Sequence, residues 1–210
     1  MTIKTIIFDF GGVLTNSPIE GFKKLEKTYG YSKGLITGIN MNNPNNNAWA
    51  KSERGEIDID TFLYQFEQEA LEIGHKIDAK EILMQLYGSL RPNMTEKIIS
   101  LSKLNKYKLI CLTNVLKGIN IFMPKDREKA VNNVMSYFDK IYESYKIGMR
   151  KPESKIYEYL IEDLGIIPKE TVFLDDLGMN LKTAKQLGIN TIKVINPNDA
   201  INELDYLLNN

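Results

Sequence analysis

The stretch Thr5-Ile6-Ile7-Phe8-Asp9-Phe10-Gly11-Gly12-Val13-Leu14-Thr15 decides the fold class of this 210-residue chain. It begins with a short apolar run, which ends at Asp9 and is followed after one residue by two glycines. A short apolar run closed by turn-forming residues is typical of a buried strand. Similar runs recur in the C-terminal half, so residues 5–8 indicate one strand of a larger sheet.

Strand and helix patterns alternate through the C-terminal half of the chain. Segments 108–112, 171–174 and 191–195 have the apolar, β-branched or aromatic content of strands. Apolar residues recur at helical spacing in segments 152–164, with Pro152 expected in the first turn, 181–187 and 200–208. Strands that alternate with helices predict an α/β fold in which helices cover both faces of a parallel sheet.

Residues 16–92 have a different pattern. Apolar residues there recur at helical spacing, as at Phe62 and Phe66, and no strand pattern is present. The asparagine-rich segment 42–47 is a loop by composition. We therefore predict a small α-helical insert at residues 16–92, after the first strand, and a core formed by residues 1–15 and 93–210.

The composition argues against two classes of partner. Lysine plus arginine and aspartate plus glutamate each number 27, so the formal net charge is zero and favours neither nucleic acid nor an anionic membrane. No run approaches the ~20 apolar residues of a membrane helix, and the first strand pattern leaves no room for a signal peptide, which favours a cytoplasmic protein. Cys111 lies within an apolar run and is predicted to be buried. A monomer and a homodimer both remain open.

Polar residues directly after the predicted strands, or in the loops beside them, are the candidate functional residues, because ligands of parallel sheets bind beyond the carboxyl ends of the strands. They are Asp9, Thr113, Asn114, Lys151, Asp175, Asp176 and Asn180. Taken singly, such residues are more often turn formers, helix caps or surface charges. Their common placement at strand ends favours an active site. His75, the only histidine, has no partner motif and receives no role.

The chemistry of this set points to a metal and an anion. Neighbouring carboxylates repel one another, and burial increases that cost, so a bound cation would relieve both penalties. Oxygen ligands favour a hard ion, and few carboxylates together with a phosphate suit Mg²⁺. Lys151 would then supply positive charge, and Thr113 a hydroxyl donor, for a tetrahedral anion. Asp9 would be placed to attack phosphorus and form an aspartyl-phosphate.

With these motifs the chain resembles the haloacid dehalogenase-like superfamily over essentially its full length. The segments Gly148–Glu153 and Phe173–Lys182 look most like the branch that holds the phosphatase domain of soluble epoxide hydrolase and bacterial glucose-1-phosphate phosphatases. The resemblance implies a Rossmann-like sheet, with the helical insert as a cap over the active site. The roles it implies are nucleophile for Asp9, phosphate binding for Thr113 and Lys151, further substrate contacts for Gly12 and Asn114, Mg²⁺ binding for Asp9, the Gly11 carbonyl, Asp175 and Asp176, and support for Asn180.

Gly11 departs from the pattern that the resemblance implies. Most phosphatases of the superfamily place a second aspartate two residues after the nucleophile, where it acts as general acid and base. Glycine keeps a backbone carbonyl for the metal but offers no acid, and such help is typically worth roughly 10²–10⁴-fold in rate. Slow activity, or activity confined to good leaving groups, is therefore expected.

The function favoured by the sequence is that of a Mg²⁺-dependent hydrolase of small phosphate monoesters, such as sugar phosphates, acting on a small phosphorylated metabolite. One alternative is a protein that binds phosphate esters but has impaired catalysis. A second is a haloacid dehalogenase. The Asp175-Asp176 pair argues against the second, because dehalogenases of the superfamily lack this pair and use no metal.

Overall fold

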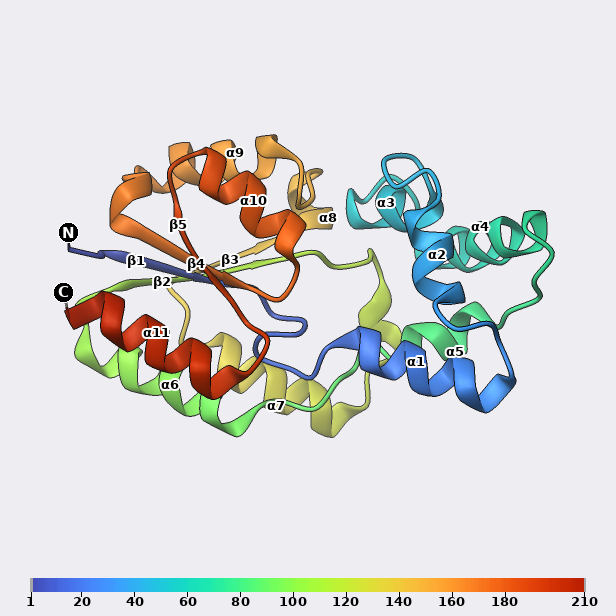
Figure 1. The fold of residues 1–210 in the computed structure, drawn as a ribbon, viewed down its shortest axis with the longest axis horizontal. Helices are drawn as coiled ribbons and strands as arrows, with labels where there is room; N and C mark the ends of the chain where they lie inside the picture. The colour runs from blue at the N-terminus through green and yellow to red at the C-terminus, as the bar shows by residue number, and fades with distance from the viewer. Residues whose placement is uncertain (1, 210) are drawn as a thin grey trace.

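A five-stranded parallel sheet forms the centre of the molecule in the computed structural model, which describes residues 2–209 (Figure 1). The strands are β1 (Thr5–Phe8), β2 (Lys108–Thr113), β3 (Lys140–Glu143), β4 (Thr171–Asp175) and β5 (Asn190–Lys193). Their order across the sheet is β3-β2-β1-β4-β5. The predicted α/β class with a parallel sheet is confirmed.

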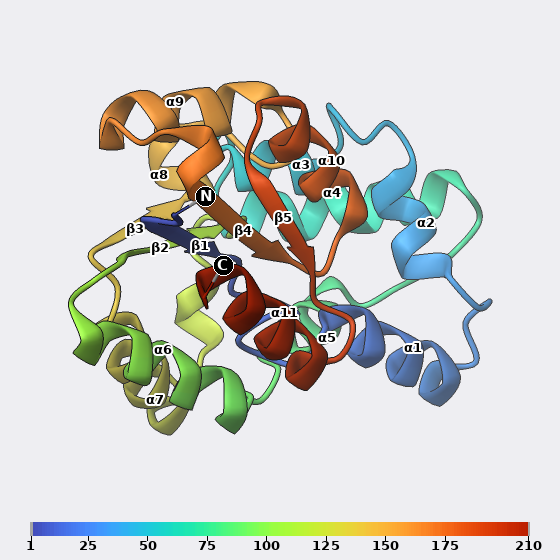
Figure 2. The ribbon, with the colours of Figure 1, turned by 60° about the vertical axis from the view of Figure 1, so that its left-hand side comes forward.

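Helices cover both faces of this sheet (Figures 1 and 2). One face is covered by α6 (Pro92–Leu104), α7 (Lys125–Met135) and α11 (Pro197–Asn209), and the other by α8 (Ser144–Ile147), α9 (Ser154–Leu164) and α10 (Gly178–Gln186). Two short 3₁₀ helices, Ile119–Phe122 and Pro168–Glu170, complete the core connections.

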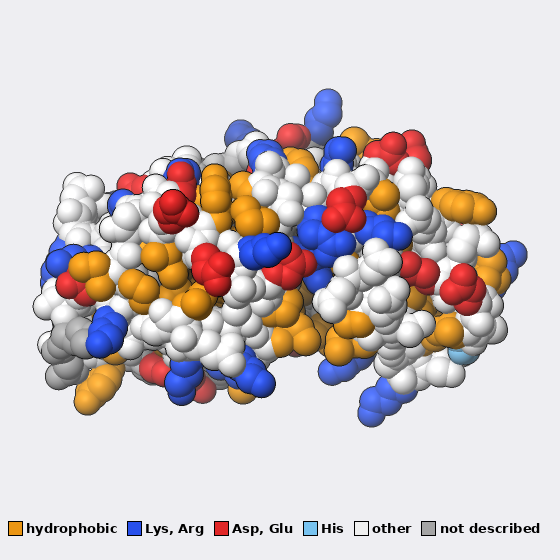
Figure 3. Space-filling model, turned by 90° about the horizontal axis from the view of Figure 1, so that it is seen from above, with side chains coloured by type: hydrophobic (Ala, Val, Ile, Leu, Met, Phe, Trp, Pro, Cys, Tyr) orange, Lys and Arg blue, Asp and Glu red, His pale blue; other side chains and the backbone are white. Residues whose placement is uncertain are grey.

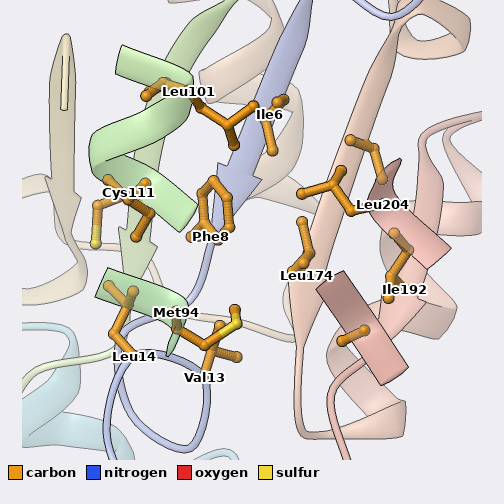
Figure 4. Close-up of a cluster of buried hydrophobic side chains, with 14 of the residues drawn as sticks. Ile6, Phe8, Val13, Leu14, Met94, Leu101, Cys111, Leu174, Ile192 and Leu204 are labelled. Atoms are coloured by element: carbon orange, nitrogen blue, oxygen red, sulfur yellow. The ribbon is translucent and has the colours of Figure 1, made fainter. Parts of the chain in front are cut away.

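Alternation along β1 explains the two layers, because successive strand residues point to opposite faces. Ile6 and Phe8 pack with residues of α6 and α11, whereas Ile7 packs with residues of α9 and α10. Figure 4 shows Ile6 between Leu101 of α6 and Leu204 of α11, and Phe8 between Cys111 and Leu174. Cys111 lies in the same cluster and is fully buried, as predicted, and burial raises the pKa of its thiol.

Five helices between β1 and α6 form a helical insert, and its apolar cluster also includes Leu116 and Ile119, which follow β2 in the core. The helices are α1 (Pro18–Tyr29), α2 (Leu35–Met41), α3 (Ala48–Glu53), α4 (Ile59–Glu72) and α5 (Ala79–Met84). Trp49, Phe62 and Phe66 pack ring against ring at its centre, with centroids 5.4–5.6 Å apart. Figure 1 places the insert beyond the carboxyl ends of the strands.

The two chain segments that join the insert to the core run side by side. Thr15 and Leu90 form an antiparallel bridge, and the Asn16 amide donates to the Ser89 carbonyl at 3.0 Å. Backbone hydrogen bonds therefore fix the point where the chain leaves the core and returns.

Some local features differ from the sequence prediction. Strand β3 and helix α7 were not predicted, because each has only one fully buried residue, Tyr142 in β3 and Val134 in α7. Helix α9 begins at Ser154, so Pro152 precedes the helix instead of lying in its first turn. Among the described residues no helix is long and apolar enough to cross a membrane.

Candidate active site

Three predicted site residues meet because their strands are neighbours in the sheet. Asp9 follows β1 directly, Thr113 ends β2 and Asp175 ends β4, and β1 pairs with both β2 and β4. After β3, at one edge of the sheet, the chain crosses to the other side of β1 to form β4. A crossing of this kind leaves a crevice at the carboxyl ends of the central strands, where α/β proteins bind their ligands.

Lys151 joins two of the carboxylates that end these strands. Its Nζ lies 2.9 Å from Asp9 Oδ2 and 2.8 Å from Asp175 Oδ2, and the lysine is only 1% exposed. Burial on its own would lower the pKa of Lys151, but the charges of Asp175 and Asp9 outweigh it, so the pKa is raised. The ammonium therefore remains charged at the floor of the site.

Most acceptor positions of the Asp175 carboxylate are occupied by hydrogen bonds. Besides Lys151, the carboxylate accepts from the Leu177 amide at 2.7 Å and from Asn180 Nδ2 at 3.0 and 3.1 Å. Asn180 is buried in turn, and its carbonyl accepts from the Tyr157 hydroxyl at 3.0 Å. Asp175 thus lies fixed beneath the site, with Asn180 as its support.

Asp176 has more freedom and faces the cavity. Its Oδ2 accepts a hydrogen bond from Ser17 Oγ at 3.1 Å, just before helix α1 of the insert. Burial, followed by the neighbouring charge of Asp175, raises the pKa of Asp176. The Asp176 carboxylate is therefore better placed than that of Asp175 to bind a further partner in the cavity, such as a cation.

A divalent cation fits the donor set of this site. One carboxylate oxygen from each of Asp9, Asp175 and Asp176 lies within 4.8 Å of the others. Burial also raises the pKa of Asp9 strongly, against the opposing effect of Lys151, and the charges of Asp175 and Asp176 raise it further. Excess negative charge on buried oxygen ligands is what a hard cation such as Mg²⁺ relieves.

The two glycines after Asp9 differ in their surroundings. Gly12 has a φ of +76°, and a Cβ added there would lie 2.1 Å from Asp176 Oδ2. Gly11 lines the cavity without a positive φ, and its Cβ would meet only Pro18 Cγ, at 4.0 Å. Gly12 is therefore required by the close approach of Asp176, whereas a side chain fits at Gly11.

Thr113 and Asn114 hold different parts of the site. The Thr113 hydroxyl is buried beside the cavity, and within residues 2–209 its one hydrogen bond is a long contact, 3.4 Å, with the Asn114 carbonyl. Asn114 makes two reciprocal hydrogen bonds with the Lys151 backbone: Oδ1 accepts from the amide and Nδ2 donates to the carbonyl, both at 2.9 Å. Asn114 thus fixes the Lys151 loop, a role that the sequence alone did not indicate.

The site opens into a cavity of about 940 Å³ between the sheet edge and the insert. Its walls combine aromatic and apolar side chains with amides, and the insert contributes Phe22, Asn40 and Trp49 among them. Sequence reasoning also missed Glu53 of the insert, a buried carboxylate in this wall.

Fold and site define the class of this protein: an α/β protein with an acidic, lysine-bridged site at the carboxyl edge of a parallel sheet, facing a helical insert. Residues 3–188 match the haloacid dehalogenase-like hydrolase family, and the chain belongs to that family. The predicted family is confirmed, and with it the interpretation of the chain as a phosphatase-like hydrolase.

Several relatives align with nearly the whole length of the chain. The chain is 28% identical to D-ribitol-5-phosphate phosphatase of Bacteroides thetaiotaomicron, covering 99% of both proteins. It is 32% identical to mouse acyl-CoA dehydrogenase family member 10 and 26% identical to mouse bifunctional epoxide hydrolase 2, with 98% of the chain covered in each case. The chain spans only 19% and 39% of those two relatives.

One solved structure bears on the metal. A family enzyme from Bacteroides thetaiotaomicron, crystallised with magnesium and inorganic phosphate, matches with a TM-score of 0.60 and 31% identity. The match covers 91% of this chain and 93% of that one.

Proposed function

We propose that this protein is a Mg²⁺-dependent phosphatase that hydrolyses small phosphate monoesters through an aspartyl-phosphate on Asp9. The observation that carries the proposal is the position of the Lys151 ammonium, 2.9 Å from Asp9 and 2.8 Å from Asp175 at the end of the central strands. A strand-terminal carboxylate, a buried positive charge and an acidic cluster therefore lie together beside one cavity, and this arrangement supports the proposal.

Asp9 is the nucleophile of the proposed reaction. Its Oδ1 accepts a hydrogen bond from the Phe10 amide at 2.6 Å, and its Oδ2 contacts Lys151, so the carboxylate is oriented before the substrate binds. Attack by a carboxylate oxygen of Asp9 forms an oxygen–phosphorus bond and breaks the bond to the leaving oxygen, which departs as an anion and takes a proton from water. A second water then attacks the acyl phosphate, releases inorganic phosphate and restores the carboxylate.

Lys151 and Thr113 bind the phosphoryl group. The buried ammonium offsets charge on the phosphoryl oxygens, and the Thr113 hydroxyl, which has only a long internal contact, is available to donate. In phosphoryl transfer, catalysis depends mainly on such positioning and charge stabilisation.

The residues that would hold Mg²⁺ are Asp9, Asp176 and the Gly11 carbonyl, with Asp175 in a supporting position. A bound Mg²⁺ supplies electrostatic stabilisation of the transferring phosphoryl group. Magnesium in the related enzyme of known structure supports this assignment.

The helical insert is proposed to act as a cap, formed by residues 16–92 on a core of residues 1–15 and 93–210. Its residues make one wall of the cavity, and closing such a wall excludes water from the reaction. The phosphatase relative that acts on D-ribitol 5-phosphate supports a small phosphorylated metabolite as substrate.

Gly11 favours a second candidate, a protein that binds phosphate esters without turning them over. The cavity offers no acid at this position, and a binding protein would need Lys151 and Thr113 but not a general acid. The acidic cluster argues against halide displacement, because negative charge near Asp9 serves no purpose there without a cation.

A screen for phosphate release separates these candidates. Purified protein is incubated with Mg²⁺ and a panel of sugar phosphates, acyl phosphates and p-nitrophenyl phosphate, and the Asp9→Asn variant serves as the control for contaminating phosphatases. Release by the wild type but not by the variant supports the enzyme. Saturable binding of the same esters without release would support the binding protein.

A further inference from the structure

Glu53 is the one residue of the insert whose carboxylate reaches the loops around Lys151 in the described part of the chain. It ends helix α3 and is only 7% exposed. Its Oε2 accepts from Asn114 Nδ2 at 3.1 Å and from Arg150 Nε at 2.5 Å. Its Oε1 accepts from Trp49 Nε1 at 3.0 Å.

Both core partners of Glu53 control the backbone of Lys151. Asn114 bonds the Lys151 amide and carbonyl, and Arg150 is the residue immediately before Lys151. A buried carboxylate with three donors has a fixed place, because loss of a donor would leave a charged oxygen with fewer hydrogen bonds away from water, and loss of Arg150 would also leave its charge unpaired. Glu53 therefore contacts two residues that adjoin the Lys151 backbone, one through hydrogen bonds and one through the chain.

The close fit of α3 on the core supports this view. Gly55 has a φ of +73°, and a Cβ there would lie 2.5 Å from the Tyr145 carbonyl oxygen. Lys117 donates its backbone amide to the Ser52 carbonyl and its Nζ to the Gly55 carbonyl. Figure 3 shows Lys and Arg side chains beside Asp and Glu side chains where the core, at the left, meets the insert, at the right.

We propose that Glu53 is a positioning residue for Lys151: when the insert lies on the core, Glu53 orders Asn114 and Arg150 and thereby fixes the lysine between Asp9 and Asp175. This rests on the proposed function, since it assigns Lys151 to phosphoryl binding. If Glu53 has this role, the insert completes the phosphate site. Docking of the insert on the core and the correct position of Lys151 are then coupled.

Glu153 provides a matched control. Arg54 of the insert pairs with Glu153 of the core at 3.2 Å, so this contact also joins the two parts. In the described structure the side chain of Glu153 contacts neither Asn114 nor Arg150, and its carboxylate is more exposed than that of Glu53. Comparing Glu53→Gln with Glu153→Gln separates positioning of the lysine from docking alone.

The experiment measures kcat and KM for p-nitrophenyl phosphate with Mg²⁺. In Glu53→Gln we expect kcat/KM to fall about 100-fold, mostly through kcat, because a small displacement of a catalytic group costs on that order. In Glu153→Gln the expected loss is less than about fivefold, as for exposed ion pairs. A loss confined to KM, or equal losses in both variants, would overturn the proposal.

A cycle with Asn114→Ala tests the route through Asn114. If Glu53 acts through Asn114, Glu53→Gln should cost at least about tenfold less in the Asn114→Ala background than in the wild type. Independent, additive losses would contradict the proposal. Glu53→Asp, which keeps the charge but shortens the reach, replaces Glu53→Gln should the latter not fold.

Fluorescence gives a readout that does not depend on turnover. Trp49 is the only tryptophan, and its indole donates to Glu53, so its emission reports on this contact. Titration with inorganic phosphate in the presence of Mg²⁺ should change the Trp49 emission of the wild type and of Glu153→Gln at similar phosphate concentrations. Glu53→Gln should need a higher phosphate concentration, because its Lys151 is less well positioned. A wild type that shows neither phosphate binding nor turnover would refute the proposed function, whereas unchanged binding and kcat in Glu53→Gln would refute only the positioning role.

Discussion

Restoring an acid at Gly11 is the perturbation that tests the reaction most directly. The cavity-facing glycine has no positive φ, and the nearest atom to an added Cβ is Pro18 Cγ at 4.0 Å, an ordinary van der Waals contact. Gly11→Asp should therefore fold. Gly11→Asn has nearly the same shape but no acid, and it is the matched control.

The expected gain depends on the leaving group. A positioned general acid contributes roughly 10²–10⁴-fold, or about 3–5 kcal/mol at 1.36 kcal/mol for each tenfold step. An alkyl leaving group, which departs as a poor anion, should receive most of this gain. A nitrophenolate is already stable as an anion and should receive little, so the two substrates serve as internal references.

The assay compares kcat/KM for p-nitrophenyl phosphate with that for an alkyl phosphate in three proteins. The wild type should prefer the aryl ester, Gly11→Asn should keep this preference, and Gly11→Asp should reduce the aryl-to-alkyl ratio by at least about tenfold. No preference in the wild type, together with an unchanged ratio in Gly11→Asp, would show that another residue supplies the proton. The account of Gly11 would then be refuted.

Three further outcomes follow from the geometry. Asp9→Asn should reduce phosphate release to background while the melting temperature stays measurable; turnover near that of the wild type would exclude the covalent route. A chelator should abolish activity. The stabilisation by Mg²⁺ should grow as the pH rises, because burial raises the pKa values of Asp9 and Asp176, and protons bound to these carboxylates in the metal-free form compete with the metal. A thermal shift independent of pH would contradict this. Gly12→Ala, with its Cβ 2.1 Å from Asp176, should lose roughly 2 kcal/mol or more of stability, whereas Gly11→Ala should lose little; equal losses measured by denaturant unfolding would refute the distinction.

The central strands could be predicted from sequence because they are buried on both faces and consist largely of apolar residues. All four residues of β1 are buried, and so are all five of β4. Edge strand β3 could not be predicted from the sequence, because only Tyr142 among its four residues is buried. Without alternation or a continuous apolar run, a strand of this kind is recognised only through its pairing with β2.

The candidate site also contains residues that could be predicted from the sequence and one that could not. Asp9, Thr113 and Asp175 end adjacent parallel strands, and the rule that ligands bind beyond the carboxyl ends of such strands applies to the sequence alone. Glu53 could not be found in this way, since a glutamate on a short helix normally faces solvent. Its spacing of four from Trp49 was a signal for a pair on one helix face, but its partner Arg150 lies 97 residues away and is brought near only by docking of the insert.

Charge balance in the site indicates how an aspartate at position 11 would behave. Three carboxylates around one ammonium leave a formal charge of minus two, which a divalent cation would cancel and a bound phosphate dianion would restore. A fourth carboxyl group added beside that complex would meet negative charge and partial burial, and both raise its pKa. Both effects favour the protonated form of the Gly11→Asp side chain when substrate is bound, and this is the form that a general acid requires. Its kcat/KM for an alkyl phosphate should fall on the alkaline side of a pH profile, a limb that Gly11→Asn should lack. Identical profiles for the two variants would mean that the new carboxyl does not deliver the proton.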